Sequence, residues 1–304
     1  MPLVPTPPPQ HEATWTHHEA IINGVRLHYV EAGASMGNEE LRPLVILLHG
    51  FPEFWYSWRH QITALAEAGL HVIAPDMRGY NTSEKPLGLR NYRIEILTDD
   101  VAALIRHAGA SKATVVGHDW GGIVAWYMPM RYPSLVEKLI VLNAPHPLAM
   151  ARQLRKPSQM LRSSYALFFQ LPLLPELALR AHNYAMLRRV LRNDPTLPHT
   201  FTKHDINRYV QANSQPGALT ATLNYYRAAF RFTWPRVLRQ TRRIETPTLL
   251  IWGEEDRYLE IGMTENLEQW VPDLRVERLP NVSHWVQHEV PEKVNQLMIE
   301  FLQR

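Results

Sequence analysis

Five short, continuous apolar runs constrain the fold of this chain more than any other feature. They are residues 44–50, 71–76, 114–119, 139–145 and 248–253, and each ends in a polar residue or a Gly/Pro turn. Such runs are typical of strands that are buried on both faces of a parallel sheet. Apolar residues share one helical face over 94–105, between two of these runs, and again over 294–302, after the last run. Alternating strands and helices predict an α/β fold with a mainly parallel central sheet flanked by helices.

Two further strands are predicted with less regular patterns. Residues 25–30, VRLHYV, mostly alternate between apolar and polar, which favours a half-buried strand near a sheet edge. A last strand is expected at about 275–279, before the final helix.

The alternation of strands and helices stops between about Pro147 and Trp234. This stretch contains Arg- and aromatic-rich helical segments separated by Pro-containing turns, without a buried-strand pattern. A chain of 304 residues is long for one layered core and short for two ordinary domains. We therefore expect one core formed by residues 15–146 and 236–304, a helical insertion over 147–235 that we call the cap, and a proline-rich tail over 1–14.

The composition excludes several classes of protein. With 45% hydrophobic and 20% charged residues the chain is globular, and no apolar run is long enough to span a bilayer. The absence of cysteine excludes disulfides, thiolate metal sites and a cysteine nucleophile. The N-terminus lacks the basic and apolar regions of a signal peptide, so we expect a cytoplasmic protein.

A net charge of only +3 conceals an uneven distribution of charge along the chain. Residues 151–243 contain 16 of the 32 Lys and Arg but only three of the 29 Asp and Glu. One interpretation is a solvated outer face of the cap helices. The other is a positive field that attracts anionic amphiphiles or an anionic membrane surface.

Residues 115–122, VVGHDWGG, place an aspartate where a predicted strand turns into a helix. Asp119 could be a helix N-cap that satisfies free amides. The flanking Gly117 and Gly121, however, permit the tight strand-to-helix elbow on which many hydrolases hold a nucleophilic serine. The helix N-terminus also favours the ionised carboxylate, so Asp119 needs no base to become a nucleophile.

The segment HGFPE, residues 49–53, follows the first of the five buried runs. In hydrolases with such an elbow, the loop after this strand supplies one backbone N–H of an oxyanion hole, and the residue after the nucleophile supplies the other. The sequence therefore predicts an oxyanion hole formed by the backbone of Phe51 and Trp120.

A base and an acid are expected after the last two predicted strands. His284, in NVSHW, precedes the final helix, whereas its rival His288 lies on a helix. A catalytic histidine needs an acid to orient it, and Asp256 follows the strand 248–253. Glu254 and Glu255 compete with Asp256 by proximity alone. The chain order of nucleophile, acid and base is that of the α/β-hydrolase fold.

An aspartate nucleophile paired with a histidine base implies a covalent ester. Asp119 would attack an electrophilic carbon, and His284 would activate the water that hydrolyses the ester. A halide and an epoxide oxygen are both leaving groups that suit this machinery.

The sequence resembles the soluble epoxide hydrolases of the α/β-hydrolase fold from about residue 15 to the C-terminus. The resemblance rests on HGFPE, DMRGYNTSEKP, GHDWGG, SYALFFQLPLLPE, SQPGALTATLNYYR, WGEEDRYLE and NVSHW. It implies a lipophilic epoxide and water as substrates, with no metal, nucleotide or flavin cofactor. It implies no nucleic-acid partner and no transmembrane segment, and it leaves a weak homodimer open.

In that family two cap tyrosines hold and protonate the epoxide oxygen. The resemblance assigns one of these roles to Tyr226, whereas Tyr225 points about 100° away around a helix. One branch of the family has its other tyrosine at the position of Phe168, which cannot donate. Another branch has it at the position of Tyr165, on the same helical face, so we predict Tyr165. The residues expected to line the substrate pocket are His49, Pro52, Phe168 and Trp285.

The alternative is a haloalkane or haloacid dehalogenase with the same nucleophile. Trp120 could donate to a halide, but the asparagine that often supplies a second donor is replaced by Phe51. A fluoroacetate-type dehalogenase normally has an arginine after its nucleophile, where this chain has Trp120. A serine esterase is excluded because Asp119 occupies the elbow.

Overall fold

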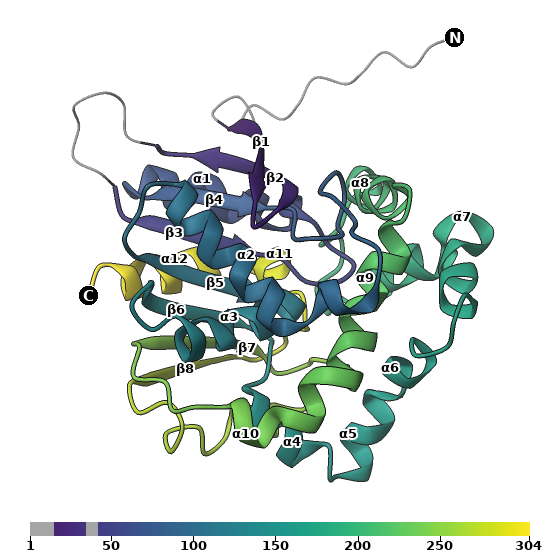
Figure 1. Cartoon of the computed structure of the whole chain (residues 1–304). Coiled ribbons are helices and arrows are strands. Elements are labelled where there is room, and N and C mark those ends of the chain that lie inside the picture. Colours follow the sequence, from purple (N-terminus) through teal and green to yellow (C-terminus); the bar gives the residue numbers. More distant parts are fainter. Residues whose placement is uncertain (1–14, 35–41) are drawn as a thin grey trace.

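The computed structural model describes residues 15–34 and 42–304, so the tail predicted over 1–14 lies outside the described residues. The described residues form an eight-stranded sheet with the order β1-β2-β4-β3-β5-β6-β7-β8 (Figure 1). Its strands are β1 (Thr16–Ile22), β2 (Val25–Ala32), β3 (Leu44–Leu48), β4 (His71–Pro75), β5 (Ala113–His118), β6 (Val136–Leu142), β7 (Thr248–Gly253) and β8 (Leu274–Leu279). Strands β1, β2 and β4 pair antiparallel, and every other pair is parallel. The predicted α/β fold with a mainly parallel sheet is confirmed.

The central strands are continuous apolar runs because helices cover both faces of the sheet. Alternate residues of β3 contribute to different clusters: Ile46 packs with α2 and α3, whereas Val45 packs with α1 and α12. These helices are α1 (Arg59–Glu67), α2 (Ile94–His107), α3 (Asp119–Arg131) and α12 (Pro291–Leu302). Both segments with a predicted amphipathic face, 94–105 and 294–302, therefore lie in helices that flank the sheet.

The antiparallel edge differs from the prediction in one strand. β2 covers the predicted strand over 25–30, but the edge itself is β1, which sequence patterns did not reveal. Most β1 side chains are exposed or half-buried, so the strand carries polar residues on both faces and no apolar signal. Because β1 shields β2, the side chains of β2 are more buried than their alternating pattern indicates.

The cap, residues 147–235, contains helices and no strand. Its α-helices are α4 (Pro147–Gln153), α5 (Pro157–Arg162), α6 (Ser164–Phe168), α7 (Leu174–Asn193), α8 (Lys203–Asn213) and α9 (Ala218–Ala228). Figure 1 shows α6, α7 and α8 along the right-hand side of the view, outside the layers of sheet and flanking helices. Short helices α10 (Val237–Gln240) and α11 (Val286–Glu289) belong to the core.

Helix α7 is interrupted near its middle. His182, Asn183 and Tyr184 have φ values of 49°, 56° and 59°, in the left-handed region that non-glycine residues seldom occupy. The interruption redirects the second half of α7, so that Tyr184, Met186 and Leu187 face the cavity described below.

Candidate active site

Asp119 stands at the junction of β5 and α3 with a backbone φ of 49°. Two neighbouring glycines are required by close packing rather than by their own backbone angles. A Cβ atom on Gly117 would lie 2.2 Å from the carbonyl oxygen of Gly121, and one on Gly121 would lie 2.1 Å from that of Leu48. Strand and helix therefore meet in a tight elbow, and the carboxylate of Asp119 reaches the cavity at its tip.

The two oxygens of the Asp119 carboxylate face different groups. The backbone N–H of Phe51 donates to Oδ1 at 2.8 Å, whereas Oδ2 lies 3.7 Å from Nε2 of His284. Burial raises the pKa of Asp119, and the positive charge of His284 and the N–H groups of Phe51 and Trp120 oppose that rise. One oxygen is thus held by backbone donors while the other stays open to a reaction partner.

His284 lies between two carboxylates. Its Nδ1 is 2.7 Å from Oδ2 of Asp256, and its Nε2 faces Asp119. Burial alone would lower the pKa of His284, but the hydrogen-bonded carboxylate of Asp256 and the charge of Asp119 raise it to about 9. The imidazole is therefore protonated while both carboxylates are ionised.

Asp256 is held by three more donors besides His284. Its Oδ2 accepts from the side-chain amide of Asn143 at 2.8 Å, and its Oδ1 accepts from the backbone N–H groups of Tyr258 and Leu259 at 2.7 and 3.0 Å. Although burial would raise the pKa of Asp256, the charge of His284 and these hydrogen bonds lower it. A stable anion is what orientation of an imidazole requires.

The rivals considered for acid and base lie elsewhere. Glu254 and Glu255 are exposed, whereas Asp256 is buried. His288 is buried against Glu53, with Nε2 and Oε1 2.9 Å apart, and burial lowers its pKa to about 3. Neither glutamate nor His288 lines the cavity that contains Asp119 and His284.

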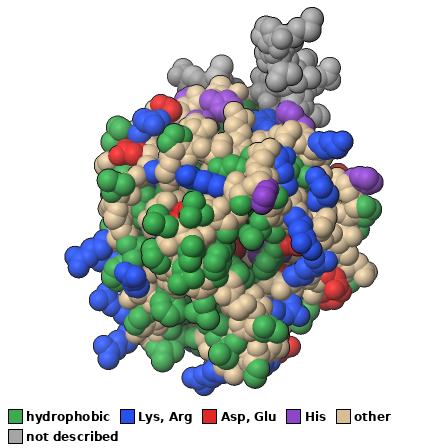
Figure 2. Space-filling view, turned by 90° about the vertical axis from the view of Figure 1, so that its right-hand side faces the viewer, with side chains coloured by type: hydrophobic (Ala, Val, Ile, Leu, Met, Phe, Trp, Pro, Cys, Tyr) green, Lys and Arg blue, Asp and Glu red, His purple; other side chains and the backbone are tan. Residues whose placement is uncertain are grey.

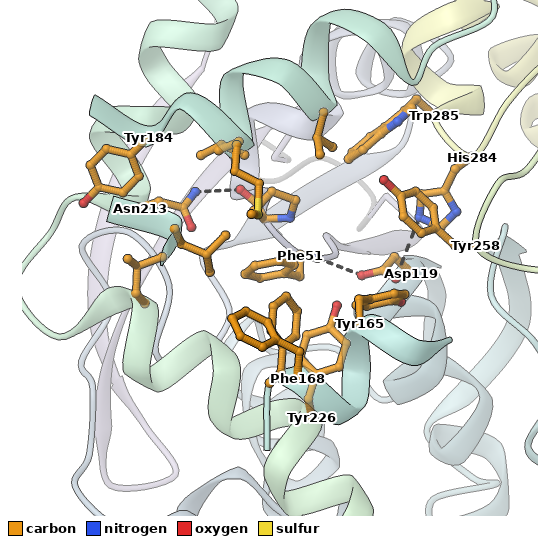
Figure 3. Close-up of a pocket in the computed structure, with 17 residues that line it drawn as sticks. Phe51, Asp119, Tyr165, Phe168, Tyr184, Asn213, Tyr226, Tyr258, His284 and Trp285 are labelled. Atoms are coloured by element: carbon orange, nitrogen blue, oxygen red, sulfur yellow. Dashed lines mark hydrogen bonds and ion pairs between the residues drawn. The ribbon is translucent and has the colours of Figure 1, made fainter. Parts of the chain in front are cut away.

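Tyr165 of α6 and Tyr226 of α9 reach the same cavity from the cap. Their ring centroids are 6.0 Å apart in an edge-to-face arrangement, and Figure 3 shows both rings next to Asp119. Burial raises the pKa of both phenols, and the charge of Asp119 adds to this effect. Tyr225 points away, and its hydroxyl donates to the carbonyl of Arg78 at 2.8 Å.

The cavity has a volume of about 280 Å³ and is lined mainly by aromatic and aliphatic side chains. Figure 3 shows Asp119, His284 and Tyr165 at one end and Tyr184 and Asn213 at the other. Such a lining, apolar with a few convergent polar groups, is typical of a site for a lipophilic ligand.

Three of the four residues expected to line the pocket do so, namely Pro52, Phe168 and Trp285. His49 does not, which corrects the prediction. Its imidazole is fully buried outside the cavity, where Nδ1 bonds the carbonyl of Gly50 at 3.0 Å and Nε2 accepts from the N–H of Met77 at 3.0 Å. His49 therefore stabilises the loop that carries Phe51 rather than contacting a ligand.

Sequence patterns did not predict the buried residues that support the site without lining the cavity. Nδ1 of His118 is 2.7 Å from Oε2 of the buried Glu53, and its Nε2 bonds the backbone carbonyl of His284 at 2.9 Å. Oε2 of Glu53 also accepts from the N–H of Gly50 at 3.0 Å. Asn143 lies near the C-terminal end of the apolar run 139–145, and a polar side chain at that place is a usable signal of a site residue.

In the ranges 15–34 and 42–304, no cluster of three or more His, Cys, Asp or Glu has a metal-binding arrangement. Within the same ranges, no helix has both the length and the apolar character needed to cross a bilayer.

The fold and the grouping of Asp119, Asp256 and His284 at strand ends define an α/β-hydrolase. A family profile described as alpha/beta hydrolase fold matches residues 43–291. The AB hydrolase superfamily protein YfhM of Bacillus subtilis is 46% identical over 92% of this chain and 95% of its own length. Epoxide hydrolase 3 of Xenopus tropicalis is 41% identical over 92% of this chain and 75% of its own length.

Solved structures lead to the same family. A mutant of an epoxide hydrolase from Bacillus megaterium superposes with a TM-score of 0.86 at 35% identity, covering 94% of this chain and all of the other. The chain therefore belongs to the epoxide hydrolases of the α/β-hydrolase fold and is a hydrolase.

Proposed function

We propose that this enzyme converts lipophilic epoxides into vicinal diols through a covalent ester on Asp119. The observation that carries the proposal is the position of two phenols and one carboxylate at the same end of an apolar cavity. A carboxylate attacks carbon, and a phenol donates the proton that an opening epoxide ring requires. Tyr165 and Tyr226 can make this donation, because both phenols are protonated at neutral pH.

In the first step, Oδ2 of Asp119 attacks a ring carbon of the epoxide. The new O–C bond forms as the ring C–O bond breaks, and the ring oxygen takes a proton from Tyr226 or Tyr165. The product is a hydroxyalkyl ester. Oδ1, which the N–H of Phe51 already holds, becomes the carbonyl oxygen of that ester.

In the second step, His284 removes a proton from water, and the hydroxide attacks the carbonyl carbon of the ester. Negative charge then develops on Oδ1, where the backbone N–H groups of Phe51 and Trp120 stabilise it. Collapse of this intermediate releases the diol and regenerates the carboxylate, which retains one oxygen atom of the water.

Alkylation of Asp119 also prepares His284 for its task. The charge of Asp119 is one cause of the raised pKa of His284, and the ester is neutral. The pKa of His284 therefore falls once the ester forms, and its proton replaces the one lost by the tyrosine. The imidazolium of the resting enzyme thus becomes the neutral base that the hydrolytic step requires.

The dehalogenase alternative lacks a halide site. Phe51 offers no side-chain donor, and the indole of Trp120 packs edge-on against Tyr226 instead of lining the cavity. Two tyrosines near the leaving group favour an oxygen that accepts a proton over a halide that does not.

A substrate panel tests the proposal. We would assay styrene oxide, an epoxy fatty acid and 1-bromobutane for diol or bromide, with Asp119→Asn as the inactive control. We expect diol from at least one epoxide and no bromide. Bromide release without diol from either epoxide would support the dehalogenase instead.

A further inference from the structure

Exposed apolar side chains are concentrated in one stretch of the cap. Of the fifteen large hydrophobic side chains that are exposed among the described residues, nine lie between Met160 and Met186. We call these nine the apolar patch. The six that are more than half exposed are Met160, Leu161, Leu167, Leu173, Leu174 and Leu177; the others are Phe168, Leu171 and Met186. Clustered exposure of this kind marks an interaction surface, whereas scattered exposed leucines do not.

The apolar patch is continuous with the lining of the cavity. Phe168 and Met186 belong to the patch and also line the cavity, so the apolar surface continues inward from the outer face. Leu173 has a φ of 62°, and its side chain is 71% exposed. A leucine held in the left-handed region with its side chain in water has no packing advantage in the isolated protein. An apolar environment that buries the side chain of Leu173 would supply such a packing advantage.

Basic residues adjoin the apolar patch, and acids are nearly absent. Residues 151–193 contain eight Lys and Arg and a single acid, Glu176, which is buried and ion-paired with Arg227. Among the described residues, no acidic side chain forms an ion pair with Arg180, Arg189 or Arg192. Figure 2 shows this face with apolar side chains gathered over its middle and lower part and Lys and Arg around them.

The interruption of α7 adds a basic hollow beside the patch. Arg188, Arg189 and Arg192 line it together with His182 and Asn183. Its basic side chains suit the anionic headgroup of a lipid, since arginine forms paired hydrogen bonds with phosphate oxygens.

We propose that the apolar patch and its basic border dock this enzyme on an anionic lipid bilayer, with the cavity entrance facing the membrane. Apolar side chains enter the boundary between headgroups and acyl chains, while Lys and Arg contact anionic headgroups. A second copy of the chain fits this face less well, because a symmetric dimer would bring two basic borders together. The docking surface does not depend on the proposed reaction. If that reaction holds, epoxides dissolved in the bilayer reach Asp119 without crossing bulk water.

Vesicle sedimentation tests the proposal with the full chain. We expect the protein to sediment with vesicles of phosphatidylcholine and phosphatidylglycerol, but not with phosphatidylcholine alone. Binding should weaken as salt shortens the Debye length from about 10 Å at 0.1 M to about 3 Å at 1 M.

Two variants separate the charged and apolar contributions. Arg180→Gln, Arg189→Gln and Arg192→Gln combined should weaken binding about a hundredfold, since each basic residue near the surface contributes about fivefold. Leu161→Ser, Leu174→Ser and Leu177→Ser combined should weaken binding by at least about tenfold. None of these six residues lines the cavity, so turnover of a water-soluble epoxide should be unchanged and reports that the variants fold.

Matched controls lie outside the cap. The triple variant Ile21→Ser, Leu87→Ser, Leu238→Ser removes three side chains that are each at least 70% exposed, and Arg90→Gln, Lys112→Gln, Lys293→Gln removes three exposed cations. Both controls should bind like the parent protein.

The proposal is overturned if the parent protein does not bind anionic vesicles, or if the control variants and the cap variants lose binding equally. A dimer in vesicle-free solution that the leucine variant abolishes would also overturn it, because the patch would then be an interface between copies.

Discussion

The core and the cap hold their parts of the site by different means. In the core, hydrogen bonds with charged partners fix the groups: Asp119 is bound by the N–H of Phe51, and Asp256 binds both His284 and Asn143. In the cap, ring packing holds the phenols. Tyr226 contacts Phe51, Trp120 and Phe169 edge to face, and Tyr165 contacts Tyr226 and Tyr258 in the same way.

This difference indicates that the core and the cap have different roles in the proposed reaction. The two steps that we propose at Asp119 need oriented charges, and the core supplies them from the ends of parallel strands. Protonation of a leaving oxygen needs only a donor within reach, and two phenols on separate helices can serve substrates of different shape. Variants of the core should therefore abolish a step, whereas variants of the cap should slow one.

The largest effect is expected for His284→Gln. Without the base, the ester on Asp119 should form but not hydrolyse, and turnover should fall roughly 10⁴-fold. Mass spectrometry should then detect the protein with an added mass equal to that of the epoxide. The double variant Asp119→Asn, His284→Gln is the control and should gain no mass. Normal turnover by His284→Gln would contradict the expectation that variants of the core abolish a step.

A smaller effect is expected for Tyr226→Phe. Loss of one proton donor should slow the alkylation step roughly 10²-fold in stopped-flow measurements. Tyr225→Phe is the matched control, because its hydroxyl bonds the carbonyl of Arg78 outside the cavity. Equal slowing by both variants would mean that the effect comes from packing.

Tyr165→Phe tests whether both phenols of the cap donate to the ring oxygen. If both phenols hold the ring oxygen, this change should slow alkylation by about tenfold to 10²-fold and leave hydrolysis of the ester unchanged. Unchanged alkylation would make Tyr165 a packing residue and leave Tyr226 as the sole protein donor.

The smallest predicted effect concerns stability and pH. The pKa of His284 is about 9 in the folded protein and about 6.5 in the unfolded chain. Because folding raises this pKa, the imidazolium stabilises the fold fully below about pH 6.5, and the stabilisation is lost as the pH rises through about 9. Urea unfolding should therefore show a larger deficit for His284→Gln at pH 6 than at pH 9.5, by at most about 3 kcal/mol. An equal deficit at both values would mean that His284 is neutral in the resting protein.

Sequence patterns predicted the core better than the cap. Strands buried on both faces are continuous apolar runs, and the residues that follow them gather at one edge of a parallel sheet. Asp119, Asp256 and His284 could therefore be selected before any geometry was known. Tyr165 and Tyr226 follow no such rule, because a cap helix can present any of its faces to the cavity, and only the family resemblance singled them out.

The failures have physical causes as well. His49 was expected to line the pocket, but the loop turns its imidazole into the protein, where two backbone groups bind it. The strand β1 was missed because an edge strand with exposed side chains carries no apolar pattern. The interruption of α7 depends on three non-glycine residues with positive φ, and their residue types do not predict it.

The central claim is that Asp119, and not water, attacks the epoxide. A single turnover in oxygen-18 water with enzyme in excess over substrate tests it most directly. The first diol should contain almost no label, because its new oxygen comes from the carboxylate of Asp119, which takes up the label during ester hydrolysis. Full labelling of the first diol would show that water attacks the ring directly, and it would contradict the covalent mechanism.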